Sequence, residues 1–171
     1  MAQKYYYLTA TLPYLSFGQE AALSRKDFLS ECEKWLSPRD LRALVSADAH
    51  CYNDGCGDVP VLSEWKEFDM EIRRASARVR AAIKKKEEYK VPEILKAVMA
   101  APDPLEMELE LEKIRWNFIE DKIPLYFFDL NRLILYYLQL QILIRMSRFN
   151  KDKGEIQFYK MCEVKYEKAV G

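Results

Sequence analysis

The sequence predicts an all-α protein, a bundle of about six or seven helices around one buried central helix. Apolar residues recur every three or four positions through most of the chain, which is the spacing of one helical face. Ser, Asp and Pro stand where helices begin, and the chain has only five Gly. Within the segment 123–149, residues 130–146 are apolar almost all the way round a helix. Such a helix is buried in a core, spans a membrane or is covered by a partner.

The central helix is expected over residues 130–146, with Asp129 as its N-cap. Residues 123–146 are about long enough to cross a membrane. However, Asp129 and Arg132 lie in the first half of this segment and Arg145 lies near its end, and each charge is costly in lipid. We therefore expect a buried core and no membrane span. Three positions on this helix would mark a partner's interface if they were exposed: Tyr136, Leu138 and Met146.

The N-terminal third begins with an aromatic, β-branched segment at 5–15. We expect it to be extended or a short strand laid over the core, with a helical turn as the alternative. A helix follows at 25–36 with Ser24 as its N-cap, and Ser37 and Pro38 begin a second, short helix.

Residues 50–60 form the clearest loop, with two Gly, an Asn-Asp pair and a Pro. We expect a single helical domain over 1–171, in which this loop is where two lobes could meet at a hinge. A long helix should then run from Ser63, as N-cap, to about residue 89. Its apolar residues fall on one face: Trp65, Phe68, Ile72, Ala75, Val79 and Ile83.

Three more helices complete the bundle. Residues 92–101 form a short one, and 105–123 form a long one capped by Asp103. After the central helix, residues 150–154 should turn the chain and 155–168 should form a final amphipathic helix.

Composition excludes several classes of function. Lys plus Arg and Asp plus Glu both number 27, so no net field favours nucleic acid or an acidic membrane. His50 is the only His, no phosphate-binding loop is present, and no nucleophile–base pair can be found. We therefore expect no enzyme and no cofactor. The four Cys are irregularly spaced without a secretory signal, which favours free thiols in a reducing cytosol.

The sequence contains two groups of residues of types that can bind metal ions. The loop residues His50, Cys51 and Cys56 supply three ligands where a closed zinc site needs four, so free loop residues are the favoured interpretation. Four glutamates are spaced by two, which scatters them around a helix, and a solvated face is expected for them: Glu106, Glu108, Glu110 and Glu112. We expect no metal site.

Basic residues gather in the second half of the long helix. Such a run is ordinarily a solvated face, and docking of an acidic protein partner is the functional alternative. Uncovered aromatic residues around 5–17 are a second candidate surface. The candidate docking residues on the long helix are Arg73, Arg74, Arg78, Arg80 and Lys84.

An ordered series of short motifs covers nearly the whole chain. It starts with YYYLTATLP at 5–13 and continues with Arg-Arg-Ala at 73–75, Arg-Trp at 115–116 and YFFDL at 126–130. The remaining matches are at 23–24, 28–29, 78–81, 104–106, 108, 140–143, 145 and 154. This series resembles an uncharacterised bacterial family encoded in V-type (archaeal-like) ATPase operons of bacteroidetes, spirochaetes and chlamydiae.

The resemblance implies a non-catalytic subunit or accessory protein of a V-type ATPase, at the cytoplasmic side of the inner membrane. More distantly, the family is similar to the all-helical subunit called C in archaea and d in eukaryotes, a socket that joins the central stalk to the membrane ring. The implied partners are thus other ATPase subunits, in the central stalk and the membrane ring. This chain is shorter than that subunit and would correspond to one lobe of it or to an assembly factor. A stand-alone helical interaction module is the other alternative, and the resemblance assigns no catalytic residues.

Overall fold

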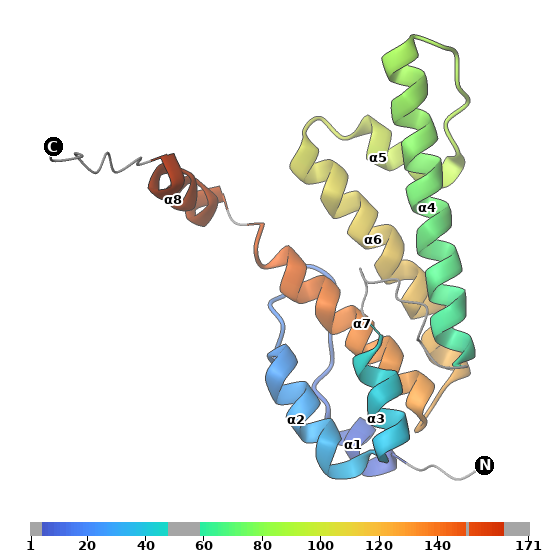
Figure 1. Ribbon diagram of the computed structural model, residues 1–171, viewed down its shortest axis with the longest axis vertical. Helices are drawn as coiled ribbons and strands as arrows, with labels where there is room; N and C mark the ends of the chain where they lie inside the picture. The colour runs from blue at the N-terminus through green and yellow to red at the C-terminus, as the bar shows by residue number, and fades with distance from the viewer. Residues whose placement is uncertain (1–4, 48–58, 150, 163–171) are drawn as a thin grey trace, which may run out of the picture.

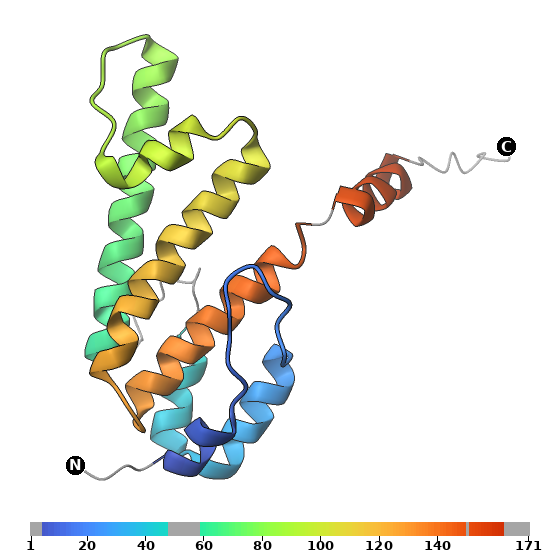
Figure 2. The same ribbon diagram turned by 180° about the vertical axis from the view of Figure 1, so that it is seen from behind.

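The structure, a computed structural model, describes residues 5–47, 59–149 and 151–162. Every regular element in these ranges is helical, which confirms the predicted all-α fold (Figures 1 and 2). The α-helices are α1 (Tyr6–Thr11), α2 (Arg25–Trp35), α3 (Pro38–Val45), α4 (Pro60–Lys85), α5 (Lys96–Ala100), α6 (Pro104–Lys122), α7 (Leu130–Met146) and α8 (Lys151–Cys162). Two 3₁₀ turns, η1 (Glu93–Leu95) and η2 (Ile123–Leu125), flank α5 and α6.

Helix α7 is the centre of the core, as its sequence predicts. All residues from 133 to 140 are buried on it, so no side of this stretch faces water. Tyr136 and Leu138 are buried and Met146 packs against the core, so none of the three positions marks an uncovered interface. The chain itself covers the helix, with the Phe28 ring of α2 stacked on both Tyr136 and Tyr137. None of the described helices combines the length and apolar character that a membrane crossing requires.

The N-terminal segment is helical at its start, where the sequence analysis favours an extended conformation. Tyr5 and Leu8 are buried, and the Tyr5 N–H donates to the Phe128 carbonyl at 3.1 Å. Because the described residues contain no strand that could pair with it, a helix is how this segment satisfies its own backbone groups. The extended conformation begins only at Leu12, since Pro13 disfavours helical geometry in the residue before it.

Helix boundaries follow local capping chemistry in most places. Four side chains accept a hydrogen bond from the backbone N–H three residues on, as predicted: Ser24, Ser37, Asp103 and Asp129. Ser63 is not a cap, and that prediction is wrong, because Pro60 already occupies the first turn of α4, where its missing N–H costs nothing. The same helix ends at Lys85, before the predicted residue 89, with Lys86 in the left-handed conformation at φ 57°.

Helix α8 begins four residues earlier than predicted. Residues 151–154 are helical where a turn is expected, so Gly154 is inside the helix. One Gly costs a helix only about 1 kcal/mol, which does not force a break. Residues 163–168 of the predicted helix lie outside the described ranges. The two opposite views show α8 standing away from the other helices (Figures 1 and 2).

Two apolar clusters hold the other helices together. The main core joins α1, α2, α3 and α7 to the start of α4 and the end of α6. A second cluster, around Ile72, Val79, Leu95 and Val98, joins the second half of α4 to η1, α5 and the first half of α6. We call this second unit the arm, residues 72–111; it extends away from α1, α2 and α3 in both views (Figures 1 and 2). Most of the 50–60 loop lies outside the described residues, and the hinge there stays a prediction.

Candidate docking site on the arm

Helix α4 presents all five predicted docking residues at its surface, but on two different sides. Arg73 and Arg80 line a groove of about 380 Å³ with residues of α5, α6 and α7. Arg74 and Arg78 line another groove of about 630 Å³, which is closed by Tyr89, Pro92 and Ile94. Lys84 is exposed and lines neither groove. The spacing explains this division. Arg73 and Arg80 are seven residues apart and share one face of α4, whereas Arg74 and Arg78 are four residues apart and share a different face.

The two sides differ in how their cations are engaged. The Arg73 Nε donates to the Asp69 carboxylate at 2.7 Å, and the Arg80 Nε donates to the Ser76 carbonyl at 3.3 Å. Arg74 and Arg78 make no ion pair or hydrogen bond with any residue that the structure describes. They lie one turn apart on the same face. Among the four arginines that line these grooves, Arg74 and Arg78 are therefore the ones available to a partner.

A buried network of charges fixes the base of the arm. Arg115 on α6 is its centre, with Nε donating to Asp69 at 2.7 Å and Nη1 donating to Glu112 at 2.9 Å. Arg145 at the end of α7 reaches the same Glu112 oxygen at 3.2 Å and donates to Glu108 at 2.8 Å. Asp69 and Glu112 are fully buried. The network ties α4, α6 and α7 together, and it sets how the arm is oriented on the main core.

The predicted solvated face of four glutamates on α6 is wrong for Glu112. This residue is fully buried, whereas Glu106 is exposed and Glu108 and Glu110 are partly so. Burial raises the pKa of Glu112, an effect that exceeds the opposing attraction of Arg115 and Arg145. One of its two oxygens, Oε2, has no hydrogen-bond partner among the described residues. A buried carboxylate with incomplete partners is held at a cost in stability.

The sequence contained a signal for this network. The buried stripe of α4 includes two polar residues, Asp69 and Ser76, at the same three- and four-residue spacing as its apolar neighbours Ile72 and Val79. A stripe chosen from apolar residues alone omits them and ends wrongly at Ile83, which is 66% exposed. A buried ion pair is indicated when a charged residue such as Asp69 occupies a position in the apolar stripe of one helix and a residue of opposite charge, such as Arg115, lies on a neighbouring helix.

The predicted loop residues His50, Cys51 and Cys56 lie outside the described ranges. Within those ranges, no group of three or more His, Cys, Asp or Glu is arranged to hold a metal ion. The two cysteines that the structure describes are free thiols, Cys32 buried and Cys162 exposed. The aromatic surface expected around 5–17 is present in part, since Tyr6, Tyr7 and Tyr14 are exposed.

Comparison with known proteins gives one match. Residues 86–166 are similar to a family whose model is described as "Protein of unknown function (DUF2764)". No curated protein and no solved structure matches the chain. The matched segment contains Glu112, Arg115 and Arg145 of the buried network. It begins after Arg73, Arg74, Arg78, Arg80 and Lys84, so the candidate docking residues are outside it.

Proposed function

We propose that this chain is a non-catalytic subunit or accessory protein of a V-type ATPase that couples or positions other subunits through protein–protein contacts. The partners would be subunits of the central stalk and of the membrane ring, at the cytoplasmic side of the membrane. ATP hydrolysis and ion transfer would take place in those partners. The chain's own contribution would be a rigid shape with a complementary surface.

Support for the identity of the complex comes from the sequence. The motifs spread from residue 5 to residue 154 resemble a family encoded in V-type ATPase operons. The match at 86–166 is to a family of unknown function and adds no named activity.

The availability of Arg74 and Arg78 is the observation that carries the docking part of the proposal. Both are exposed, and neither makes an ion pair with another described residue, including Glu67 and Glu71 of the same groove. A guanidinium pairs well with a carboxylate in planar, two-bonded geometry, so the expected partner surface is acidic. The buried network under the arm fixes helix α4, which carries these two side chains, so the backbone loses little entropy on binding.

A stand-alone helical interaction module or an ATPase assembly factor is the second candidate. An exposed aromatic surface favours it, made by Tyr6, Tyr7 and Trp35. The Tyr7 and Trp35 rings stack on each other there, with their centroids 6.3 Å apart. Aromatic side chains are enriched at interfaces of many kinds. The two candidates differ in one respect: a stoichiometric subunit stays with the intact ATPase, whereas an assembly factor leaves it.

The test is recovery of the tagged chain from the membranes of its own organism, followed by identification of what accompanies it. The wild-type chain is compared with a variant carrying Arg74→Glu and Arg78→Glu. A matched control carries Lys26→Glu and Arg148→Glu, two exposed cations on α2 and just after α7, so both variants change the net charge equally.

We expect ATPase subunits to accompany the wild-type chain and the control, and to be lost from the arm variant. Recovery of ATPase subunits with all three chains would remove the docking role of Arg74 and Arg78. Absence of ATPase subunits from every preparation would contradict the proposed function itself. Presence of the chain in intact ATPase at a fixed ratio would distinguish a subunit from an assembly factor.

A further inference from the structure

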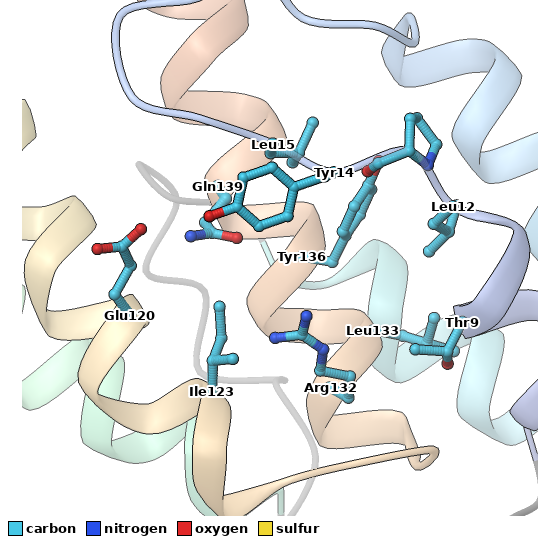
Figure 3. A pocket seen from close by; sticks show the side chains of 11 residues that line it. Thr9, Leu12, Tyr14, Leu15, Glu120, Ile123, Arg132, Leu133, Tyr136 and Gln139 are labelled. Carbon is cyan, nitrogen blue, oxygen red and sulfur yellow. The ribbon is translucent and has the colours of Figure 1, made fainter.

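A cavity separate from the two grooves of the arm lies between the N-terminal segment and α7. It has a volume of about 430 Å³ and is lined by Thr9 and residues 12–15, by two residues at the end of α6 and η2, and by one face of α7. This size suits a small organic ligand. Figure 3 shows the side chains that face it: Thr9, Leu12, Tyr14, Leu15, Glu120, Ile123, Arg132, Leu133, Tyr136 and Gln139.

Arg132 is the cation of this cavity. Its Nη1 atom is buried and has no hydrogen-bond partner among the described residues. The nearby Asp129 makes no side-chain ion pair with it; one Asp129 oxygen accepts the backbone N–H of Arg132 at 2.9 Å and the other accepts from the Asn131 amide at 3.4 Å. Burial lowers the pKa of Arg132, yet a guanidinium keeps its charge in a protein. Arg132 as a whole is partly buried, and leaving its buried Nη1 donor without a partner is costly, so an anion in the cavity would complete its hydrogen bonding.

Gln139 supplies a second polar group on the same face of α7. It is 4% exposed, and its amide makes no hydrogen bond with any described residue. Arg132 and Gln139 are seven residues apart, which places them two turns apart along the helix, about 10 Å. Tyr136 lies between them and is already engaged, because its hydroxyl donates to the Pro13 carbonyl at 2.9 Å. That bond holds the N-terminal segment over the cavity.

The charges and walls of the cavity restrict the ligand. Glu120 is the one other charged residue that lines it, so the lining carries one positive and one negative charge. A phosphate with two negative charges would meet a single cation and a repelling carboxylate, whereas a singly charged carboxylate matches one guanidinium. The rest of the lining mixes apolar side chains, among them Leu12, Leu15, Ile123 and Leu133, with polar groups such as Thr9 and Gln139. It fits a ligand body that is partly hydrocarbon.

We infer that this cavity binds a monocarboxylate with a partly apolar body, its carboxylate on Arg132 and its far end near Gln139. The carboxylate can come from a free carboxylic acid or from the C-terminus of a peptide with an apolar last residue. This inference is independent of docking at Arg74 and Arg78, which belong to another part of the surface.

The inference is tested by NMR amide chemical-shift titration of the full chain. The probes are hexanoate, its uncharged analogue hexanamide, inorganic phosphate, and the dipeptide N-acetyl-Ala-Leu with a free or an amidated C-terminus. A small acid of this size should bind with a Kd of about 1 mM. We expect hexanoate or the free dipeptide to shift amides around Arg132 and Gln139 saturably, and their uncharged counterparts to have no such effect.

Two substitutions, each with a matched control, connect binding to the residues. Arg132→Met should weaken carboxylate binding by about tenfold or more, because a charged hydrogen-bonded pair is lost. Arg148→Met, which removes an exposed cation just after α7, should leave it unchanged. Glu120→Gln should strengthen binding by removing a repelling charge. Asp121→Asn, the exposed neighbour outside the cavity, should have no effect.

Arg132→Met should also fold, since it removes a partly buried guanidinium whose buried Nη1 atom has no described partner. Its urea midpoint is expected at or above that of the wild type, which separates a binding role from a structural one. If it does not fold, Arg132→Lys gives the same comparison, with weaker binding expected from the loss of the planar fork. The inference is overturned if neither carboxylate binds, if phosphate binds more tightly than both, or if a folded Arg132 variant binds as tightly as the wild type.

Discussion

Replacement of Arg115 by Met tests whether the buried charge network fixes the base of the arm. In the wild type, the Arg115 side chain is 6% exposed and touches two fully buried carboxylates, Asp69 and Glu112. Arg115→Met replaces the cation by an uncharged, unbranched side chain of similar length. The buried site is then left with more negative than positive charge. Breaking a buried ion pair by removing one partner costs about 3–5 kcal/mol of unfolding free energy.

Arg73 provides a control with the same partner and the same bond length. Its Nε also lies 2.7 Å from an Asp69 oxygen, but its side chain is 45% exposed. Arg73→Met should therefore cost only about 0–1 kcal/mol, as exposed pairs do. A second control adds Glu112→Gln to Arg115→Met. The double variant leaves Asp69 with Arg73 and Glu108 with Arg145, so charge balance returns. It should be more stable than Arg115→Met alone.

The assay is urea unfolding followed by tryptophan fluorescence, because Trp65 and Trp116 are buried in the folded chain and become exposed on unfolding. For a chain of this size, the loss expected for Arg115→Met corresponds to a fall in melting temperature of about 6–20 °C. The reasoning is refuted if Arg115→Met costs no more than Arg73→Met. It is also refuted if the double variant is less stable than Arg115→Met, because the loss would then not arise from unbalanced charge.

Three further predictions concern single groups. Burial raises the folded-state pKa of Glu112 above its ordinary value of 4.5. Between pH 4.5 and that raised pKa, the folded chain holds a proton on Glu112 that the unfolded chain has lost. The unfolding free energy of the wild type, compared with that of Glu112→Gln, should therefore fall as the pH rises through this range and stay level above it. A difference that grows in favour of the wild type would contradict the burial effect. Asp129→Ala removes the N-cap of α7 and should cost about 1 kcal/mol in urea unfolding, whereas Asp121→Asn should cost nothing measurable; equal effects would argue against the cap. Burial raises the pKa of Cys32 to about 12, so maleimide labelling at pH 8 followed by peptide mapping should modify Cys162 and spare Cys32 in the folded chain; fast labelling of Cys32 would show that its helix opens readily.

Features of the fold that depend on local chemistry could be predicted from the sequence. The caps at Ser24, Asp103 and Asp129 need only a side-chain oxygen three residues before a backbone N–H. The burial of α7 follows from a run so apolar that no face of it could be left in water. Where two local signals compete, as Pro60 and Ser63 do, the one that fixes the backbone angle sets the boundary.

Features that depend on which helices meet could not be predicted. Nothing in the local sequence distinguishes Glu112 from the three glutamates that precede it on α6. It is buried because α6 packs against both α4 and α7 at that position. Helix α1 owes its conformation to the absence of a described strand to pair with. The cavity at Arg132 requires the N-terminal segment to cross α7, a contact between residues 123 positions apart that no local pattern encodes.

Contact between the arm and an ATPase subunit is the central claim, and photo-crosslinking in cells measures it directly. We place p-benzoylphenylalanine at position 77 of α4, an exposed Ala one turn from Arg74 and adjacent to Arg78, and at position 33 of α2, an exposed Glu, as the control. The account predicts a light-dependent product that joins position 77 to a V-type ATPase subunit, and no such product from position 33. It is contradicted if position 77 yields no ATPase product, or if both positions yield the same one.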